Sequence, residues 1–112
     1  MKAKIYILVR ESVDLGHAIL GAAHASLGGF LTWENEPCEP PHVPMRDWAR
    51  ESFRKVVCRV TDAEFEKAKT YGKEGVDYRV MTESALDNDA VSLVFRPREE
   101  WPDFFKSLKL YR

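Results

Sequence analysis

The chain has 112 residues, which suffices for one domain with a substantial core and is too short for two. Its 17 basic and 18 acidic residues nearly balance, so the composition offers no basic excess for a large non-specific nucleic-acid footprint. Hydrophobic residues make up 45% of the chain, which predicts a folded globular protein. No apolar run is long enough for a signal peptide or for the roughly 20 residues of a membrane helix, so we expect no membrane association.

The two cysteines occur in unlike contexts. Cys38 lies in a segment rich in proline and glutamate, whereas Cys58 lies in an apolar run that predicts a strand. Such contexts favour reduced thiols in a cytoplasmic protein over a disulfide framework. A nucleophilic role for Cys58 is disfavoured, because a thiol buried in a strand is inert.

The first predicted unit is a strand followed by a helix. Lys4–Arg10 (KIYILVR) is apolar and β-branched nearly throughout, which is typical of a strand buried on both faces. A turn follows, in which Ser12 or Asp14 can cap a helix over Asp14–Phe30 by accepting hydrogen bonds from its free N–H groups. In open α/β folds the start of such a helix lies at the carboxyl edge of the sheet, where ligands bind.

Histidines and glycines share one face of this helix. His17, Gly21, His24 and Gly28 are separated by four, three and four positions. Each glycine inside a helix costs roughly 1 kcal/mol relative to alanine, which is tolerated where a backbone, a packed element or a ligand comes close. Two interpretations therefore stay open: a ligand site, or tight packing with two incidental histidines. A single metal ion is disfavoured, because the Cα atoms of the two histidines would be roughly 10 Å apart.

The rest of the helix surface is mostly apolar. The residues concerned are Ile19, Leu20, Ala22, Ala23, Leu27, Phe30 and Leu31. A helix of this composition is expected to be largely buried against another element.

Residues 34–45 form a proline-rich loop insertion. The stretch Trp33–Met45 contains four prolines and no periodicity, which predicts a surface loop. Cys38 and His42 lie four positions apart, as two metal ligands can, but a structural zinc ion needs four ligands and no second pair is present. We therefore predict no metal site. Because the loop leaves the far end of the helix and must return to the sheet, one hypothesis makes it a lid over the helix N-terminus.

The remaining segments complete a mixed sheet. Thr82–Asp89 is too short for a crossover helix, so the strands on either side of it are predicted to be antiparallel. Strands separated by helices imply an α/β fold with a mixed four-stranded sheet covered on both sides, a three-layer α/β/α sandwich in one domain over residues 1–112. The other expected elements are helical turns over Arg46–Phe53, strands over Lys55–Val60, Asp77–Met81 and Ala90–Phe95, and helices over Thr61–Tyr71 and Glu99–Leu108.

Several short strings follow one another in an informative order. The first strand ends in Arg10, the turn contains Asp14-Leu15-Gly16, and the helix contains Ala23-His24-Ala25. Trp48 precedes the string Lys55-Val56-Val57, and the chain closes with LKLY at positions 108–111. In order and spacing these strings resemble the type-2 (archaeal and eukaryotic) peptidyl-tRNA hydrolase family, over nearly the whole chain apart from the proline-rich loop. The resemblance implies the fold of that family.

The same resemblance implies hydrolysis of the ester between a peptide and the 3′ end of tRNA, with tRNA as the partner and no cofactor. It implies His24 as the base or its orienter, with Glu83 holding the other ring nitrogen. His17 and Arg10 would contact phosphate or the developing oxyanion beside the positive end of the helix. The substrate-binding residues implied in this way are Arg10, Gly16, Gly21 and Ser84.

Departures from the family occur where the chemistry is expected. The family's lysine is replaced by His17 and its glutamine by Gly21. Its D-A-G-x-T segment is absent, so Glu83 or Thr82 stands nearest the expected acid. A neutral imidazole binds phosphate poorly, so His17 predicts weak tRNA affinity or a different substrate.

Other classes of function are compatible with the sequence. One is a non-catalytic ligand-binding or regulatory protein on the same fold, and another is an enzyme acting on a different substrate. A third interpretation treats the helix as merely packed and takes Trp33 and Trp101 as surface contacts of a homodimer.

Overall fold

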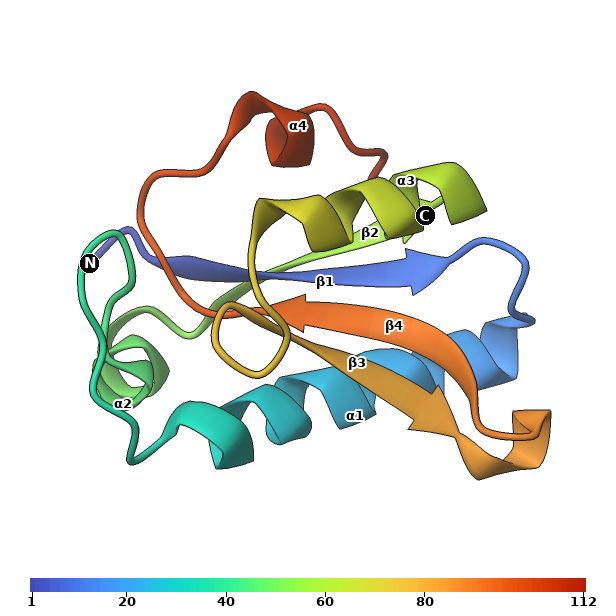
Figure 1. The fold of residues 1–112 in the computed structure, drawn as a ribbon, viewed down its shortest axis with the longest axis horizontal. Helices are drawn as coiled ribbons and strands as arrows, with labels where there is room; N and C mark the ends of the chain where they lie inside the picture. Colours follow the sequence, from blue (N-terminus) through green and yellow to red (C-terminus); the bar gives the residue numbers. More distant parts are fainter.

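The computed structural model describes residues 1–112, and its elements are drawn in Figure 1. The strands are β1 (Lys4–Arg10), β2 (Arg54–Val60), β3 (Tyr78–Glu83) and β4 (Asp89–Phe95). The α-helices are α1 (Leu15–Trp33), α2 (Met45–Asp47), α3 (Asp62–Ala68) and α4 (Asp103–Lys106). The other helical segments are a π-helical turn, η1 (Trp48–Ser52), and two 3₁₀ turns, η2 (Lys69–Tyr71) and η3 (Ser84–Leu86). None of these helices combines the length and the apolar character that spanning a membrane requires.

The strands form one mixed sheet in the order β2-β1-β4-β3. β1 pairs with β2 in parallel, whereas β4 runs antiparallel to both of its neighbours, β1 and β3. The α/β class and the mixed four-stranded sheet with an antiparallel last strand are therefore as predicted. Because β1, β2 and β3 run in one direction, their carboxyl ends lie at the same edge of the sheet.

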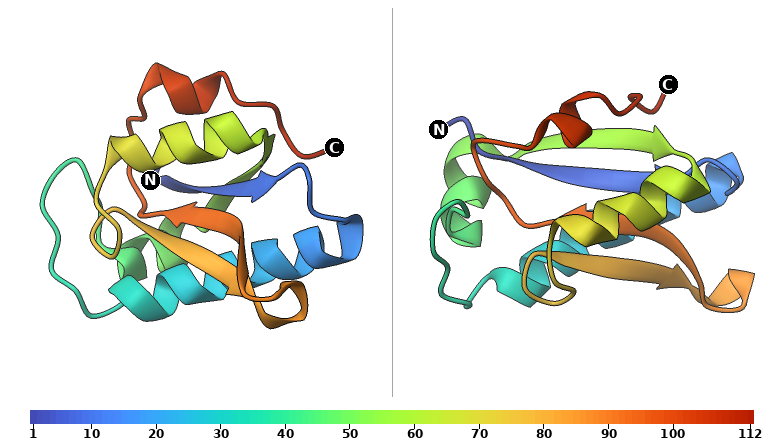
Figure 2. Two further views of the ribbon diagram at one scale, coloured as in Figure 1. Left: turned by 45° about the vertical axis from the view of Figure 1, so that its right-hand side comes forward. Right: turned by 45° about the horizontal axis from the view of Figure 1, so that its top comes forward.

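Helices cover both faces of this sheet. The central strand β1 sends Ile5 and Ile7 to one face and Tyr6 and Leu8 to the other, and all four side chains are buried. α1 and α2 pack on the first face, and α3 and α4 pack on the second, as Figure 1 and Figure 2 show. The prediction that the first strand is buried on both faces is confirmed.

Helix α1 faces the sheet with its smallest residues and one tryptophan. Its buried positions are Ala18, Gly21, Ala25, Gly29 and Trp33. A Cβ on Gly21 would lie 2.6 Å from Val91 Cγ1, and a Cβ on Gly29 would lie 3.0 Å from Val94 Cγ2. The glycines thus allow the helix backbone to approach β4 closely, which favours the packing interpretation for Gly21.

The opposite side of α1 is apolar and exposed, so the expectation of a largely buried helix is wrong there. Leu15, Ile19, Leu27 and Leu31 lie on a four-residue repeat and are 60–64% exposed. The sheet accepts only the narrow face of small residues, because larger side chains would hold the helix away from β4. The large apolar side chains therefore remain on the solvent side.

The C-terminal helix is shorter than the predicted Glu99–Leu108. α4 begins only after Pro102, because a proline disfavours the helical conformation of the residue before it, here Trp101. Trp101 is nevertheless part of the core, at 6% exposure, and Trp33 is only 1% exposed. The interpretation of these two tryptophans as surface contacts of a homodimer is therefore wrong.

The proline-rich loop lies at the end of the sheet opposite the start of α1 (Figure 1). The Val43 N–H donates to the Pro97 carbonyl at 3.0 Å, which ties the loop to the segment after β4. His42 Nε2 lies 2.8 Å from an oxygen of Asp77, the residue before β3. The lid hypothesis is therefore wrong, because the loop returns along the edge at which α1 ends.

Candidate functional site

Predicted site residues gather at the carboxyl edge of the sheet. Arg10 is the last residue of β1, and Glu83 is the last residue of β3. His17 lies in the first turn of α1, and His24 lies two turns further along the same helix. Because β1 and β3 run in the same direction on either side of β4, their carboxyl ends lie at the same edge of the sheet, beside the N-terminal half of α1 on the right of Figure 1.

His24 and Glu83 form the central pair of this site. His24 Nε2 lies 3.3 Å from Glu83 Oε2, and the two side chains are 47% and 13% exposed. Glu83 Oε1 accepts a hydrogen bond from the Ala85 N–H at 3.2 Å. This hydrogen bond, together with the nearby imidazoles of His24 and His17, lowers the pKa of Glu83 below its usual value. An ionised Glu83 orients the His24 ring and leaves Nδ1 free to accept a proton.

His17 is paired with Asp14. Its Nδ1 lies 2.5 Å from Asp14 Oδ1, and this hydrogen bond lowers the pKa of Asp14. Asp14 is the N-cap residue of α1, but its side chain makes no capping hydrogen bond and contacts His17 instead. The charge of a protonated His17 is therefore largely neutralised, which weakens its attraction for phosphate. The spacing of three residues in a first helical turn is the sequence signal for this pair.

Arg10 is held by neighbouring segments. Its Nε donates to Asp62 Oδ1 at 3.0 Å, and Nη1 donates to the Ala90 carbonyl at 2.9 Å. The side chain borders a cleft of about 270 Å³ that Asp14 and Asp89 also line. Sequence reasoning missed both Asp62 and Asp89, whose proximity follows from the strand order. The surrounding carboxylates reduce the net positive charge that Arg10 can present to a ligand.

The three other predicted substrate-binding residues differ in their surroundings. Gly16 and Ser84 are exposed, in the first turn of α1 and in η3 just after Glu83. Gly21 is buried against β4, and its carbonyl accepts a hydrogen bond from Ser92 Oγ at 3.0 Å. The structure thus places Gly16 and Ser84 at the accessible edge and Gly21 in the helix–sheet contact.

The cysteines lie outside this site. Cys58 is fully buried in β2, where burial raises the pKa of its thiol to about 11, so the thiol is protonated at neutral pH. Cys38 lies in the proline-rich loop, and both thiols are free. The structure contains no cluster of three or more His, Cys, Asp or Glu side chains that could hold a metal ion.

These residues can accept and return a proton but present little net positive charge. His24 is exposed, and one of its ring nitrogens is held by Glu83, which is the arrangement of an oriented general base. The cations of the site, Arg10 and a protonated His17, each face a carboxylate. In comparisons with known proteins, no family model and no curated protein sequence matches this chain.

Proposed function

We propose that the protein is a hydrolase resembling type-2 peptidyl-tRNA hydrolases, which cleaves the ester between a peptide and tRNA in the cytoplasm. The observation that supports this most is the pairing of the exposed His24 with Glu83 at the carboxyl edge of the sheet. Helices on both faces of the sheet are compatible with the three-layer α/β/α sandwich of that family. The choice of a peptidyl-tRNA ester as substrate, and of tRNA as partner, rests on the resemblance of the sequence to that family.

In the proposed reaction His24 is the general base. Its Nε2–H donates to Glu83, so Nδ1 takes a proton from a water molecule whose oxygen bonds to the ester carbonyl carbon. The carboxylate of Glu83 stabilises the imidazolium that forms. When the tetrahedral intermediate collapses, the bond to the ribose oxygen breaks and His24 returns its proton to that oxygen. The products are a peptide with a free carboxyl group and a tRNA with a free hydroxyl group.

His17 is the proposed donor to the developing oxyanion. Asp14 accepts a hydrogen bond from Nδ1–H of His17. When the ring is protonated, its Nε2–H is a second donor, directed away from Asp14. His17 and His24 are seven positions apart in α1 and therefore lie on the same side of the helix, two turns from each other. A substrate carbonyl on that side of the helix can accept a hydrogen bond from His17 while water is activated by His24.

Affinity for tRNA is expected to be weak and to depend little on salt. The salt-dependent part of tRNA binding comes from protein cations that displace counterions from the phosphates, and a cation already paired with a carboxylate displaces fewer of them. Arg10 is engaged by Asp62 and His17 by Asp14. Recognition of the ester end is therefore proposed to outweigh recognition of the tRNA backbone.

The decisive experiment measures cleavage of a peptidyl-tRNA at neutral pH and low salt by the wild-type protein and by His24→Ala. The variant should lose about 10²- to 10⁴-fold in rate, the usual contribution of a general base. Its melting temperature should change little, because the His24 side chain is nearly half exposed. Glu83→Gln should also be slower, whereas Glu66→Gln, an exposed glutamate on α3, is the matched control and should keep the wild-type rate.

Wild-type protein that cleaves no faster than the uncatalysed reaction would reject the proposal. That result would favour the non-catalytic binding role, for which the exposed apolar side of α1 around Ile19 and Leu27 is an available surface. An unchanged rate in His24→Ala, with cleavage by the wild type, would show that another group is the base.

A further inference from the structure

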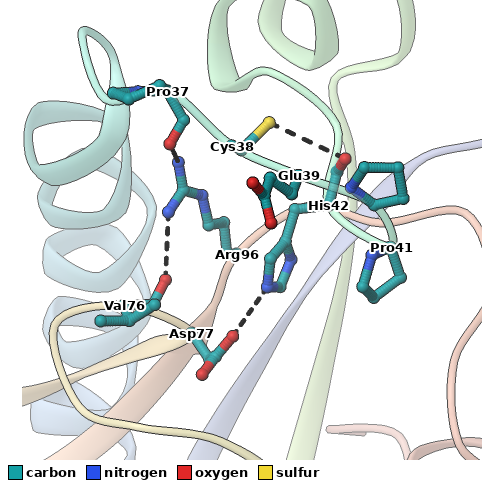
Figure 3. Close-up of a pocket in the computed structure, with 9 residues that line it drawn as sticks. Pro37, Cys38, Glu39, Pro41, His42, Val76, Asp77 and Arg96 are labelled. Carbon is teal, nitrogen blue, oxygen red and sulfur yellow. Dashed lines mark hydrogen bonds and ion pairs between the residues drawn. The ribbon is translucent and has the colours of Figure 1, made fainter.

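A second cavity lies at the end of the sheet opposite the candidate active site. Its volume is about 560 Å³. It is lined by residues 37–42 of the proline-rich loop, by Val76 and Asp77 ahead of β3, and by Arg96 just after β4, as Figure 3 shows. This volume is within the range of pockets that bind small organic molecules.

Arg96 is a buried cation without a carboxylate at ion-pair distance. The residue is 5% exposed, and its guanidinium lies 5.7 Å from the centre of the Trp33 ring. Its terminal nitrogens donate to the backbone carbonyls of Val76, Glu36 and Pro37 at 3.1–3.3 Å. The remaining donor, Nε–H, is buried and has no partner. An unpartnered buried donor on a charged group is costly, so a ligand atom that accepts its hydrogen bond is stabilised at this position.

His42 brings a second unpartnered atom to the same cavity. Its Nε2 lies 2.8 Å from Asp77 Oδ1, while the buried Nδ1 has no partner. Burial alone would raise the pKa of Asp77, but hydrogen bonds from His42 and the Lys73 N–H, together with the positive charges of His42 and Arg96, outweigh it and hold this pKa below its usual value. Both oxygens of Asp77 are thus engaged, one by His42 and the other by Lys73, and neither forms an ion pair with Arg96.

We propose that this cavity binds a small organic monocarboxylate, whose carboxylate group accepts the hydrogen bond of Arg96 Nε–H. Arg96 comes from the segment that follows β4 and His42 from the proline-rich loop, so side chains of two separate segments line the cavity (Figure 3). Glu39 and Asp77 also line the cavity. Their negative charges repel a dianion about twice as strongly as a monoanion, which favours a carboxylate over a phosphate.

The direct test follows the Nε–H signal of Arg96 in ¹H–¹⁵N NMR spectra of the protein during titration with acetate and with benzoate. Inorganic phosphate is the comparison, at matched ionic strength and at about pH 8, where most of it is the dianion. A saturable shift of this signal with a carboxylate is expected, together with a melting temperature that rises with ligand concentration, because the ligand binds the native state. An Arg96 signal that does not change, or tighter binding of phosphate than of either carboxylate, would overturn the proposal.

Two variants make the test specific. Glu39→Gln removes a negative charge from the cavity wall and should tighten carboxylate binding by about threefold. Glu51→Gln alters an exposed side chain of η1 outside the cavity lining and should leave the affinity unchanged. Equal tightening in both variants would indicate a general charge effect and contradict the assigned site.

A third variant removes the donor itself. Arg96→Lys keeps the positive charge but lacks the Nε–H group, so carboxylate binding should be lost. Undiminished binding in this variant would contradict the proposal. Should Arg96→Lys fail to fold, the Arg96 signal of the wild type and the two glutamate variants decide the question.

Discussion

At the end of the sheet where β1 and β3 terminate, each cation faces a carboxylate, whereas at the other end Arg96 is surrounded by backbone carbonyls. Arg10 donates to Asp62, and His17 contacts Asp14, in pairs that are open to solvent. Arg96 is 5% exposed and has one donor without a partner. Both ends of the sheet therefore carry an arginine, but Arg10 is paired with a carboxylate and Arg96 is not.

The difference separates two kinds of site. Exposed ion pairs contribute little free energy and can exchange protons with solvent without a large reorganisation, which suits acid–base chemistry at His24. A buried guanidinium without a counter-ion lowers the stability of the unliganded protein but strengthens any hydrogen bond that an anionic ligand makes with it. The first end is suited to proton transfer, and the second is suited to ligand binding.

The largest expected effect compares the two arginines. Arg96→Met removes three charged hydrogen bonds to the backbone, and relief of the buried charge offsets part of the loss, so the free energy of unfolding should fall by about 1–3 kcal/mol. Arg10→Met should cost less than about 1 kcal/mol, because its ion pair with Asp62 is exposed. Urea unfolding measures both values. Equal decreases in the free energy of unfolding would contradict the proposed difference between the buried Arg96 and the solvent-exposed ion pair of Arg10.

A smaller effect is expected in acid. The pKa of Asp77 is lower in the folded protein than in the unfolded chain, so this carboxylate contributes stability that is present above about pH 4 and is lost as the pH falls through the folded value. Asp77→Asn should therefore flatten the decrease of the unfolding free energy below pH 4. Asp14→Asn should flatten it less, because the Asp14 side chain is far more exposed. Urea unfolding across this pH range gives the slopes, and a steeper acid dependence in Asp77→Asn would contradict the assignment.

The smallest effect concerns salt dependence. Asp62→Asn releases Arg10 from its ion pair, which turns a paired cation at the first end into an unpaired one. If Arg10 then meets a phosphate, tRNA affinity should rise severalfold and the slope of log K against log salt should steepen by about 0.7–0.9. Asp103→Asn, on the exposed surface of α4, is the matched control. The same slope in both variants would show that Arg10 does not contact the nucleic acid.

Much of the secondary structure is predictable because its signals are local. β1 has the predicted bounds, since an apolar β-branched run needs no distant information to favour a strand. The α3 helix begins with a capping box in which Thr61 and Glu64 satisfy each other's backbone N–H groups, as the sequence signature indicates. The start of the last helix is predicted too early, because the apolar periodicity continues on both sides of Pro102. The helical conformation is disfavoured for the residue before a proline, so the helix begins only after Pro102.

The candidate site is only partly predictable. His24 and Glu83 are indicated only through the resemblance to type-2 peptidyl-tRNA hydrolases, which leaves Thr82 open beside Glu83, and the structure brings His24 Nε2 to 3.3 Å from Glu83 Oε2. The partner of Arg10 is not found, because it depends on β1 and β2 being neighbours in the sheet. The cavity around Arg96 is missed altogether, since a proline-rich loop without periodicity does not indicate which part of the sheet it will contact.

By itself the sequence determined the order and the approximate positions of the strands and helices, because periodicity, capping and proline effects act over a few neighbouring residues. Only the tertiary structure decided which side of α1 meets the sheet, which cations are neutralised and which donor is left buried and unpartnered. Those properties depend on distances between segments far apart in the chain, and ion pairs and hydrogen bonds form only where folding brings the atoms together.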